Sequence, residues 1–237
     1  MSEPTNPRET DATTELNWIR VQAASGLIFS IFLAIHLANT MLGSAGSETF
    51  DAFQSSSRSF YQNPFFELIV VLIPLAVHMT ASLVRILRRR RRNLSKPPLR
   101  LRLHRYSGWF LLAVITGHVS ATRGVGFFFD APAGFGALNL SLVFAPYLFV
   151  PYYILLGSCG SYHLWNGLSI ATRVFGVRLP NALTRGPGFW IPVGGAVLAI
   201  FVAVLSLWGM FFEVDRELWG EFGRVFAEFT GADLNEL

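Results

Sequence analysis

The chain has 237 residues, of which 52% are hydrophobic and 14% are charged, and its mean hydropathy is +0.44. This composition is too apolar for an ordinary soluble domain of that length, and it predicts an all-α integral membrane protein. The single cysteine, Cys159, excludes an internal disulfide and an iron–sulfur cluster or cysteine-rich zinc site held by this chain alone.

Residues 1–17 are polar and acidic and lack the apolar core of a signal peptide, so we expect a short, partly disordered cytoplasmic tail. Five apolar stretches follow that are long enough to cross about 30 Å of hydrocarbon as helices. They cover residues 18–42, 64–87, 106–122, 142–172 and 188–212. The sequence therefore predicts a five-helix membrane domain over residues 18–212 and an acidic extramembrane segment over residues 213–237.

The fourth stretch contains Pro146 and Pro151, so its beginning is expected to be a loop or a kinked first turn. All but four of the 19 basic residues fall at one end of this topology. The positive-inside rule then places the amino terminus and the Arg-rich segment, residues 85–105, in the cytoplasm and the carboxyl terminus outside. The leading interpretation of the arginine run 88–92 is a solvated cluster beside anionic lipid headgroups. The run is also suited to docking a soluble partner.

Four of the five histidines fall inside predicted spans one to four, in the order His36, His78, His118 and His163, whereas His104 lies at the cytoplasmic start of span three. Counted from the basic residues at the cytoplasmic ends, His36 and His118 lie in the outer half of the membrane. By the same count His78 and His163 lie in the inner half.

Two imidazoles that face each other from different helices are the ligands of a bis-histidine haem, which suits electron transfer because it has no open coordination position. The sequence therefore predicts two haems b, with the haem iron ligated by His36 and His118 on the outer side and by His78 and His163 on the inner side. A buried histidine that merely hydrogen-bonds a neighbouring helix is the alternative for each residue taken alone.

An internal repeat accompanies these histidines. Ser25-Gly26 precedes His36 in SGLIFSIFLAIH, and Ser107-Gly108 precedes His118 in SGWFLLAVITGH with the same spacing. The outer histidines are 82 residues apart and the inner histidines are 85 apart, as expected of a duplicated two-helix unit. We infer that the two glycines make room for the inner haem; close packing of helices against small residues is the alternative.

Two arginines near the predicted membrane ends are candidates for binding haem propionates. Arg85 lies seven residues after His78 on the same helix face, and Arg123 lies five residues after His118 on the outer side. Ordinary snorkelling of a long cationic side chain explains both equally well.

At this point the sequence resembles the dihaem cytochrome b membrane-anchor subunit of succinate dehydrogenases and fumarate reductases, of the type with one five-helix polypeptide. The resemblance covers about residues 18–212 and rests on the set Arg20, Ser25, Gly26, His36, His78, His104, Arg105, Tyr106, Ser107, Gly108, His118 and His163. In that family the histidines of helices one and three bind the distal haem, and those of helices two and four bind the proximal haem.

The resemblance implies a multi-pass subunit of respiratory complex II in a prokaryotic cytoplasmic membrane, linked to the tricarboxylic acid cycle. It also implies a flavoprotein and an iron–sulfur subunit on the cytoplasmic side, which carry FAD and the clusters, and a membrane quinone, menaquinone or ubiquinone, as substrate. Such a chain carries electron transfer and the quinone site but does not itself oxidise succinate.

Quinone reduction needs polar groups near a haem, and the outer-side candidates are Asn39, Glu48, Arg123 and Asp130, among which the sequence does not choose. The catalytic residues therefore stay open. Some relatives place a membrane glutamate beside a haem ligand as part of a proton path. Predicted spans three to five contain no Asp or Glu, and Glu67, near the outer end of span two, is the only acidic residue in a predicted span. A transmembrane proton path of that kind is accordingly not expected.

Three other functions compete with this interpretation. A gamma-type cytochrome b of another quinone-linked oxidoreductase also has two haems, but the nitrate reductase type takes two histidines from each of two helices. A haem-free transporter with proton-relaying histidines would more naturally carry acidic residues in its spans. A haem-free structural anchor is the third.

Overall fold

The computed structural model describes residues 7–90 and 97–237, and all of the regular structure in those residues is helical. The α-helices are α1 (Pro7–Leu42), α2 (Ser47–Tyr61), α3 (Pro64–Phe66), α4 (Ile73–Arg90), α5 (Leu99–Val119), α6 (Val125–Phe128), α7 (Phe135–Phe144), α8 (Pro146–Val174), α9 (Asn181–Thr184), α10 (Gly186–Leu207) and α11 (Gly220–Thr230). Two π-helical segments, η2 (Glu67–Leu72) and η3 (Ser120–Gly124), and two 3₁₀ turns, η1 (Gly43–Ala45) and η4 (Arg216–Trp219), complete the described regular structure.

In the described residues, four helical stretches are long and apolar enough to cross a membrane: Ala12–Ala45, Pro64–Arg88, Leu99–Phe128 and Gly186–Leu207. They correspond to predicted spans one, two, three and five. The second combines α3, η2 and α4, and the third combines α5, η3 and α6. The chain therefore has the character of a membrane protein, as its composition predicts.

The fourth predicted span, residues 142–172, is not among these four stretches, and it breaks into two helices. The break lies at Ala145, directly before Pro146, which occupies the first turn of α8, where proline is well tolerated, whereas Pro151 lies inside the helix. At 29 residues α8 is long enough to cross a bilayer, but it is less apolar because it lies inside the bundle and buries Ser161, Asn166 and Ser169. Five crossings and a cytoplasmic amino terminus stay predictions.

Three other boundaries differ from the sequence prediction. Helix α1 begins at Pro7, so residues 7–17 are helical rather than a disordered tail, and proline suits a first helical turn. The third stretch starts at Leu99 instead of residue 106 and continues to Phe128 because π-helical turns carry it on without a break. Helix α10 ends at Leu207 rather than residue 212, and Gly209 follows with a φ of 90°.

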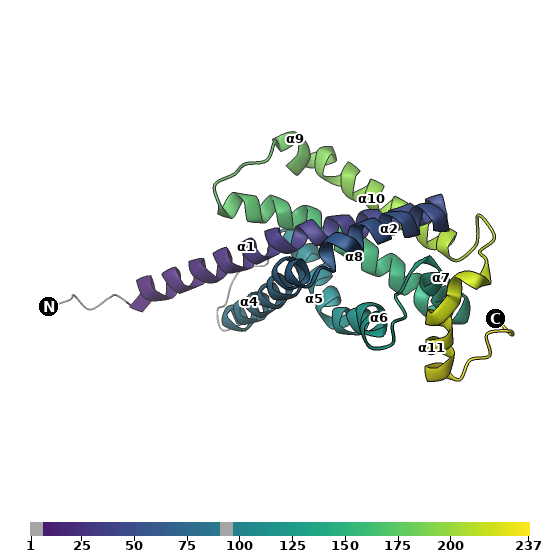
Figure 1. Ribbon diagram of the computed structural model, residues 1–237. Helices are drawn as coiled ribbons and strands as arrows, with labels where there is room; N and C mark the ends of the chain where they lie inside the picture. Colours follow the sequence, from purple (N-terminus) through teal and green to yellow (C-terminus); the bar gives the residue numbers. More distant parts are fainter. Residues whose placement is uncertain (1–6, 91–96) are drawn as a thin grey trace.

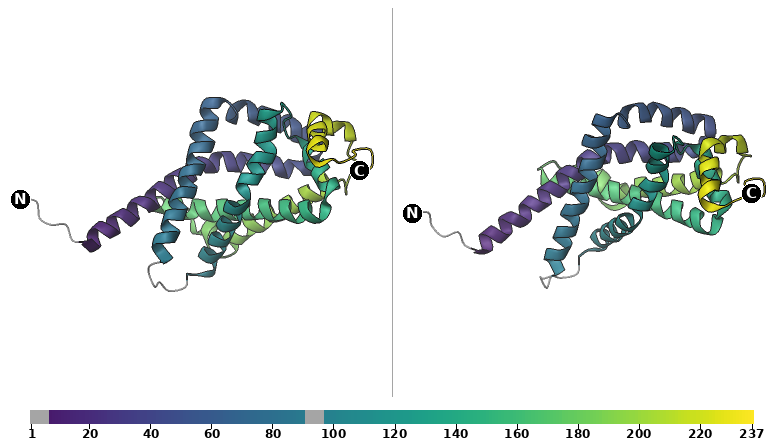
Figure 2. Two further views of the ribbon diagram at one scale, coloured as in Figure 1. Left: turned by 90° about the horizontal axis from the view of Figure 1, so that it is seen from below. Right: turned by 60° about the horizontal axis from the view of Figure 1, so that its bottom comes forward.

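The helices pack around α1 and α8, which lie against each other. Helix α4 packs on α1, whereas α5 and α10 pack on α8. Helices α4 and α5 therefore pack on different helices and make little contact with each other within the described residues. Figures 1 and 2 show α4 and α5, here called the two arms, running side by side, with α1 extending beyond them at its amino-terminal end. The bundle thus consists of an α1–α4 pair and an α5–α8 pair.

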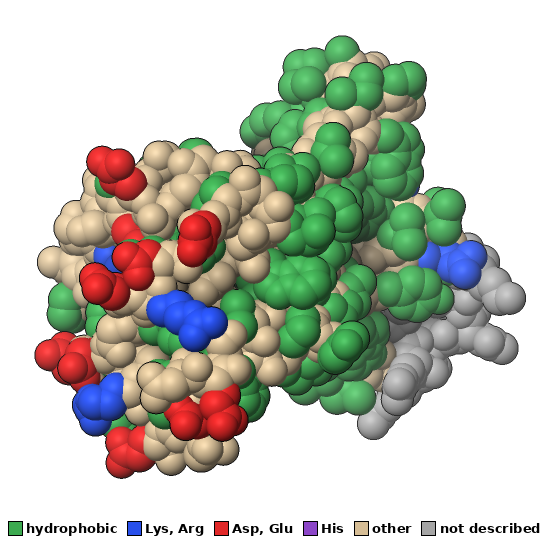
Figure 3. Space-filling view, turned by 90° about the vertical axis from the view of Figure 1, so that its right-hand side faces the viewer, with side chains coloured by type: hydrophobic (Ala, Val, Ile, Leu, Met, Phe, Trp, Pro, Cys, Tyr) green, Lys and Arg blue, Asp and Glu red, His purple; other side chains and the backbone are tan. Residues whose placement is uncertain are grey.

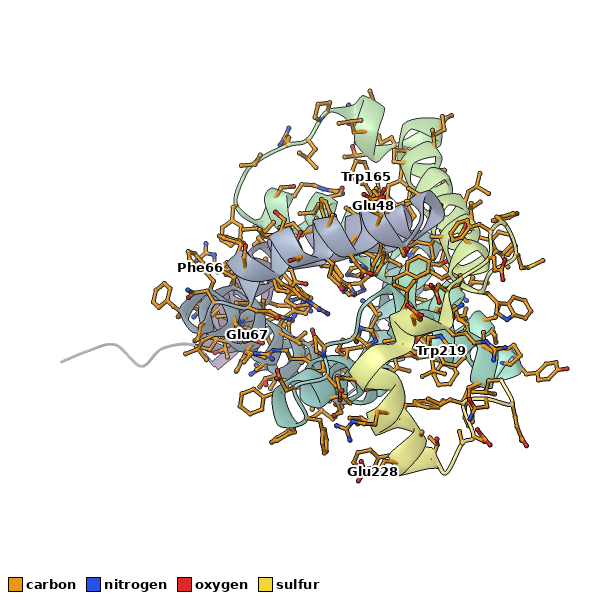
Figure 4. The ribbon with its side chains drawn as sticks, turned by 45° about the vertical axis from the view of Figure 1, so that its right-hand side comes forward. Glu48, Phe66, Glu67, Trp165, Trp219 and Glu228 are labelled. Atoms are coloured by element: carbon orange, nitrogen blue, oxygen red, sulfur yellow. The ribbon has the colours of Figure 1, made fainter. Side chains whose placement is uncertain are left out.

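The carboxyl-terminal segment folds back over one end of the bundle. Trp219, labelled in Figure 4 where η4 meets α11, is buried, and its indole N–H donates to the Asn139 side-chain oxygen over 2.9 Å. The Asn139 amide in turn donates to the Leu207 carbonyl over 2.8 Å. Figure 3 shows carboxylates scattered over part of this end and apolar side chains filling the flank beside it. The predicted acidic segment is therefore a packed cap that includes α11.

Candidate functional site

The structure brings His36, His78, His118 and His163 together in two pairs. The rings of His36 on α1 and His118 on α5, here the outer pair, have centres 5.9 Å apart and planes inclined by 69°. The rings of His78 on α4 and His163 on α8, here the inner pair, have centres 6.2 Å apart and planes inclined by 87°. These are the two pairs that membrane depth predicts, each drawn from one helix of each two-helix unit.

The spacing within each pair fits one metal ion held between two rings. An imidazole nitrogen binds a metal at about 2 Å, and the ring centre lies about 1 Å behind it, so two rings on one ion have centres about 6 Å apart. The described residues contain no group of three or more His, Cys, Asp and Glu side chains that could hold a metal. The pairs therefore fit a metal whose remaining ligands come from a macrocycle, as in haem.

The inner histidines are oriented by main-chain oxygens. Nδ1 of His78 lies 3.0 Å from the carbonyl oxygen of Gln22, and Nδ1 of His163 lies 3.2 Å from that of His104. A carbonyl only accepts, so Nδ1 of each ring carries the hydrogen and Nε2 is left as a free lone pair. A histidine that ligates a metal through one nitrogen commonly donates from the other in this way.

A glycine on the neighbouring helix lets each ring of the inner pair approach that helix closely. A Cβ atom on Gly26 would lie 2.9 Å from Nδ1 of His78, and one on Gly108 would lie 3.0 Å from Cε1 of His163. The first distance is shorter than real Cβ contacts, and the second is so tight that the ring would have to shift. The two glycines make room for the rings of the inner pair, and the room for a haem that the sequence suggests stays a prediction.

The repeat seen in the sequence corresponds to a repeat of side-chain contacts in the structure. Ser25 and Ser107, which precede the glycines, both donate to the helix carbonyl of the preceding turn, with distances of 2.8 and 3.0 Å. Thr40 and Thr122 donate to the carbonyl oxygens of His36 and His118, each four residues earlier, over 3.0 and 2.7 Å. The α1–α4 and α5–α8 pairs thus build the same site framework twice.

The two histidine pairs lie at different levels along the bundle. On α1, Gly26 contacts the inner pair, and His36 belongs to the outer pair ten residues later. Helix α5 repeats this spacing with Gly108 and His118. At the helical rise the two levels are about 15 Å apart.

His104 is a site residue that the analysis of single histidines misses. Its ring stacks on that of His163, with centres 4.0 Å apart and planes inclined by 12°. The 82-residue offset, applied to His104, gives Gln22, whose side chain donates instead to Ser82 over 2.6 Å. The repeat could therefore have identified His104, because it occupies the Gln22 position of the second unit.

Arg85 is held on the α1 side of the inner pair. Its guanidinium pairs with Glu15 over 3.2 Å and donates to the side-chain oxygen of Gln22. Because the Gln22 main chain accepts from His78, this arginine supports the residue that orients the ring. The structure thus gives Arg85 protein partners in addition to its predicted position near the inner site.

Arg123 forms a two-pronged ion pair with Glu67 on the outer side. The two bonds measure 2.6 and 2.9 Å, and the Glu67 side chain is 17% exposed. Glu67, labelled in Figure 4, begins η2, and Arg123 lies in η3, so the pair joins the two π-helical segments. π-helical turns are rare and frequently mark functional sites.

A further arginine, Arg58 on α2, lies near the outer pair and was not predicted. It donates to the Ala133 carbonyl, while its Nε is buried and has no hydrogen-bond partner among the described residues. Arg58 also contacts the hydroxyl of Tyr61, whose pKa is raised by burial, so this hydroxyl stays protonated at neutral pH. The Tyr61 ring packs on Phe32, and Phe32 stacks on His36 at 5.6 Å.

The remaining quinone-site candidates are dispersed. Asn39 is buried on α1, three residues after His36, and its side-chain oxygen has no hydrogen-bond partner within the described residues. Glu48, labelled in Figure 4, is exposed in the first turn of α2, and Asp130 is exposed with a φ of 53°. Of these candidates, only Asn39 is a buried polar group close to a histidine along its helix.

No family model matches the chain, and comparisons with curated proteins and with solved structures also give no match.

Proposed function

We propose that the chain is the dihaem cytochrome b membrane subunit of a succinate:quinone oxidoreductase or fumarate reductase. In this role it anchors the flavoprotein and iron–sulfur subunits and carries electrons to or from a membrane quinone. The observation that supports this most is the pairing of four histidines across two repeated helix pairs at two levels. The nitrate reductase type of cytochrome b, by contrast, takes two histidines from each of two helices.

The residues around each pair fit a bis-histidine haem. When bound by two imidazoles, a haem b exchanges one electron and offers no open coordination position. The Gln22 and His104 carbonyls hold the inner rings in the tautomer that leaves Nε2 free, and Gly26 and Gly108 let those rings approach the neighbouring helix.

The ends of the bundle differ in charge, which suits partners of different kinds. The Arg-rich end carries the residues expected to meet a soluble iron–sulfur subunit. The opposite end carries Arg58, Arg123, Glu67 and Tyr61 around the outer pair, a set of groups able to hydrogen-bond a quinone carbonyl. The substrate of the complex is decided by the flavoprotein partner, so succinate is inferred from the resemblance alone.

Single histidine substitutions test this proposal. His36→Ala or His118→Ala should remove one of two spectral components of the reduced purified protein, and His78→Ala or His163→Ala should remove the other. The reason is that both ligands of one iron lie in one pair. If His36→Ala and His78→Ala depleted the same component, the pairing would be wrong.

A further inference from the structure

A basic cavity lies at the Arg-rich end of the bundle, apart from the histidine pairs. It has a volume of about 700 Å³ and is lined by the beginning of α5, the end of α8 and the loop that carries α9. Figure 1 shows α9 at the top of the view, beside the start of α10 and joined by a loop to the end of α8. Its volume falls in the range of cavities that bind small molecules.

Four guanidinium groups line the cavity, and none of the lining residues is acidic. The lining residues are Arg100, Ser169, Arg173, Arg178, Leu179, Pro180, Asn181, Thr184 and Arg185. Four like charges around one hollow repel each other, and a bound anion relieves that repulsion. The charge of the cavity therefore selects an anionic ligand.

Two of these arginines are held in place by the protein. Arg173 bonds the Ser169 carbonyl and hydroxyl, both over 2.7 Å. Arg100 donates to the Thr184 carbonyl over 2.7 Å and to the Asn166 side-chain oxygen over 2.8 Å, and its guanidinium lies 3.5 Å above the Phe189 ring. The arginines are thus positioned before any ligand arrives, which reduces the entropy lost on binding.

Two buried donors beside the cavity have no partner in the described residues. They are Nε of Arg100 and the side-chain amide nitrogen of Asn166, which itself is 2% exposed. A buried N–H without an acceptor costs free energy, so an acceptor is expected nearby. Phosphate oxygens are strong acceptors for arginine and amide N–H groups.

The position of the cavity along the helices indicates the source of the phosphate. Arg100 lies in the first turn of α5, Arg173 in the last turn of α8 and Arg185 directly before α10. In a membrane these helix ends lie at the level of the lipid headgroups, and basic pockets between helices on the cytoplasmic side bind such headgroups. We propose that this cavity binds the phosphate of an anionic phospholipid.

The test uses the full chain, purified in detergent and freed of lipid, with native mass spectrometry counting the bound lipids. Titration with a short-chain phosphatidylglycerol should give one tightly retained molecule per chain, and phosphatidylcholine should not. The double substitution Arg173→Gln and Arg178→Gln should weaken this binding at least tenfold. Arg216→Gln with Arg224→Gln, at the opposite end, is the matched control and should leave the affinity unchanged.

Four outcomes would overturn the proposal. The first three are equal binding of phosphatidylcholine, an equal loss of affinity in the control variant, and retention of inorganic phosphate instead of lipid. The fourth is a double variant that loses haem or a soluble partner while its lipid binding stays intact. The visible spectrum of each variant separates this test from that of the histidine pairs. A colourless wild-type protein that still binds one phosphatidylglycerol would refute the proposed function alone.

Discussion

At the scale of single residues, the rings of the inner pair are constrained from two sides. A main-chain carbonyl fixes the tautomer of each ring, and a glycine four residues further along the same helix removes the side chain that would block it. The carbonyl and the glycine belong to one helix turn, so a single turn of α1 or α5 orients a histidine ring borne by another helix. In metal sites, such support of a ligand usually affects metal affinity strongly.

Adding a methyl group at these glycines tests their role. Gly26→Ala or Gly108→Ala places Cβ about 3 Å from an imidazole atom, which we expect to displace the ring, destabilise the protein by about 1–3 kcal/mol and deplete or shift the inner spectral component. Thermal unfolding and difference spectra measure the two effects.

Gly117→Ala on α5 is the matched control, because nothing lies within 4 Å of its added Cβ. In a helix interior this change should be neutral or stabilising, since alanine favours helix more than glycine does. An inner spectral component unaltered by Gly26→Ala would contradict the role given to that glycine.

At the scale of elements, the two π-helical segments are joined by one ion pair. η2 precedes α4 and η3 follows α5, so Glu67 and Arg123 connect arms that otherwise make little contact within the described residues. The pair is bidentate and partly shielded, which makes it stronger than an exposed pair.

Glu67→Gln should destabilise the protein by about 1–2 kcal/mol, because the Arg123 charge loses its partner in a partly buried setting. Glu221→Gln is the matched control: it breaks an ion pair with Arg224 whose side chains are 65% and 63% exposed, and it should cost under about 0.5 kcal/mol. Unfolding in denaturing mixed micelles compares the two variants. Equal losses in both would show that the Glu67 pair is no more than a surface contact.

The elements also show what the sequence could predict. Hydrophobic length located the helices of spans one, two, three and five, and the histidines that residue spacing pairs have neighbouring rings. Hydrophobicity does not reveal that α8 lies inside the bundle, because a buried helix can carry polar residues such as Asn166 that hydrogen-bond side chains of neighbouring helices. The stacking of His104 and the Arg58–Tyr61 contact depend on helix rotation and loop path, which spacing does not determine.

At the scale of the whole molecule, the number of crossings decides on which sides the termini lie. Four spans would place both ends on one side, whereas α8 as a fifth crossing places them on opposite sides. The excess of arginine at one end favours an amino terminus in the cytoplasm and a carboxyl terminus outside.

Cysteine labelling in cells tests this topology. In a Cys159→Ala background, Asn235→Cys should react with a membrane-impermeant maleimide in intact cells, and Ser2→Cys should react only after the membrane is permeabilised. The same accessibility at both positions would contradict five crossings and leave α8 as a helix that does not span.

The haem content of the purified full chain tests the central claim most directly. Two histidine pairs with ring centres about 6 Å apart predict two low-spin haems b per polypeptide, measured by pyridine haemochrome absorbance against protein concentration. A stoichiometry near two, with one haem lost on substitution of either pair, is the expected result. A colourless protein that is helical and monodisperse, prepared from cells supplied with haem, would contradict the account.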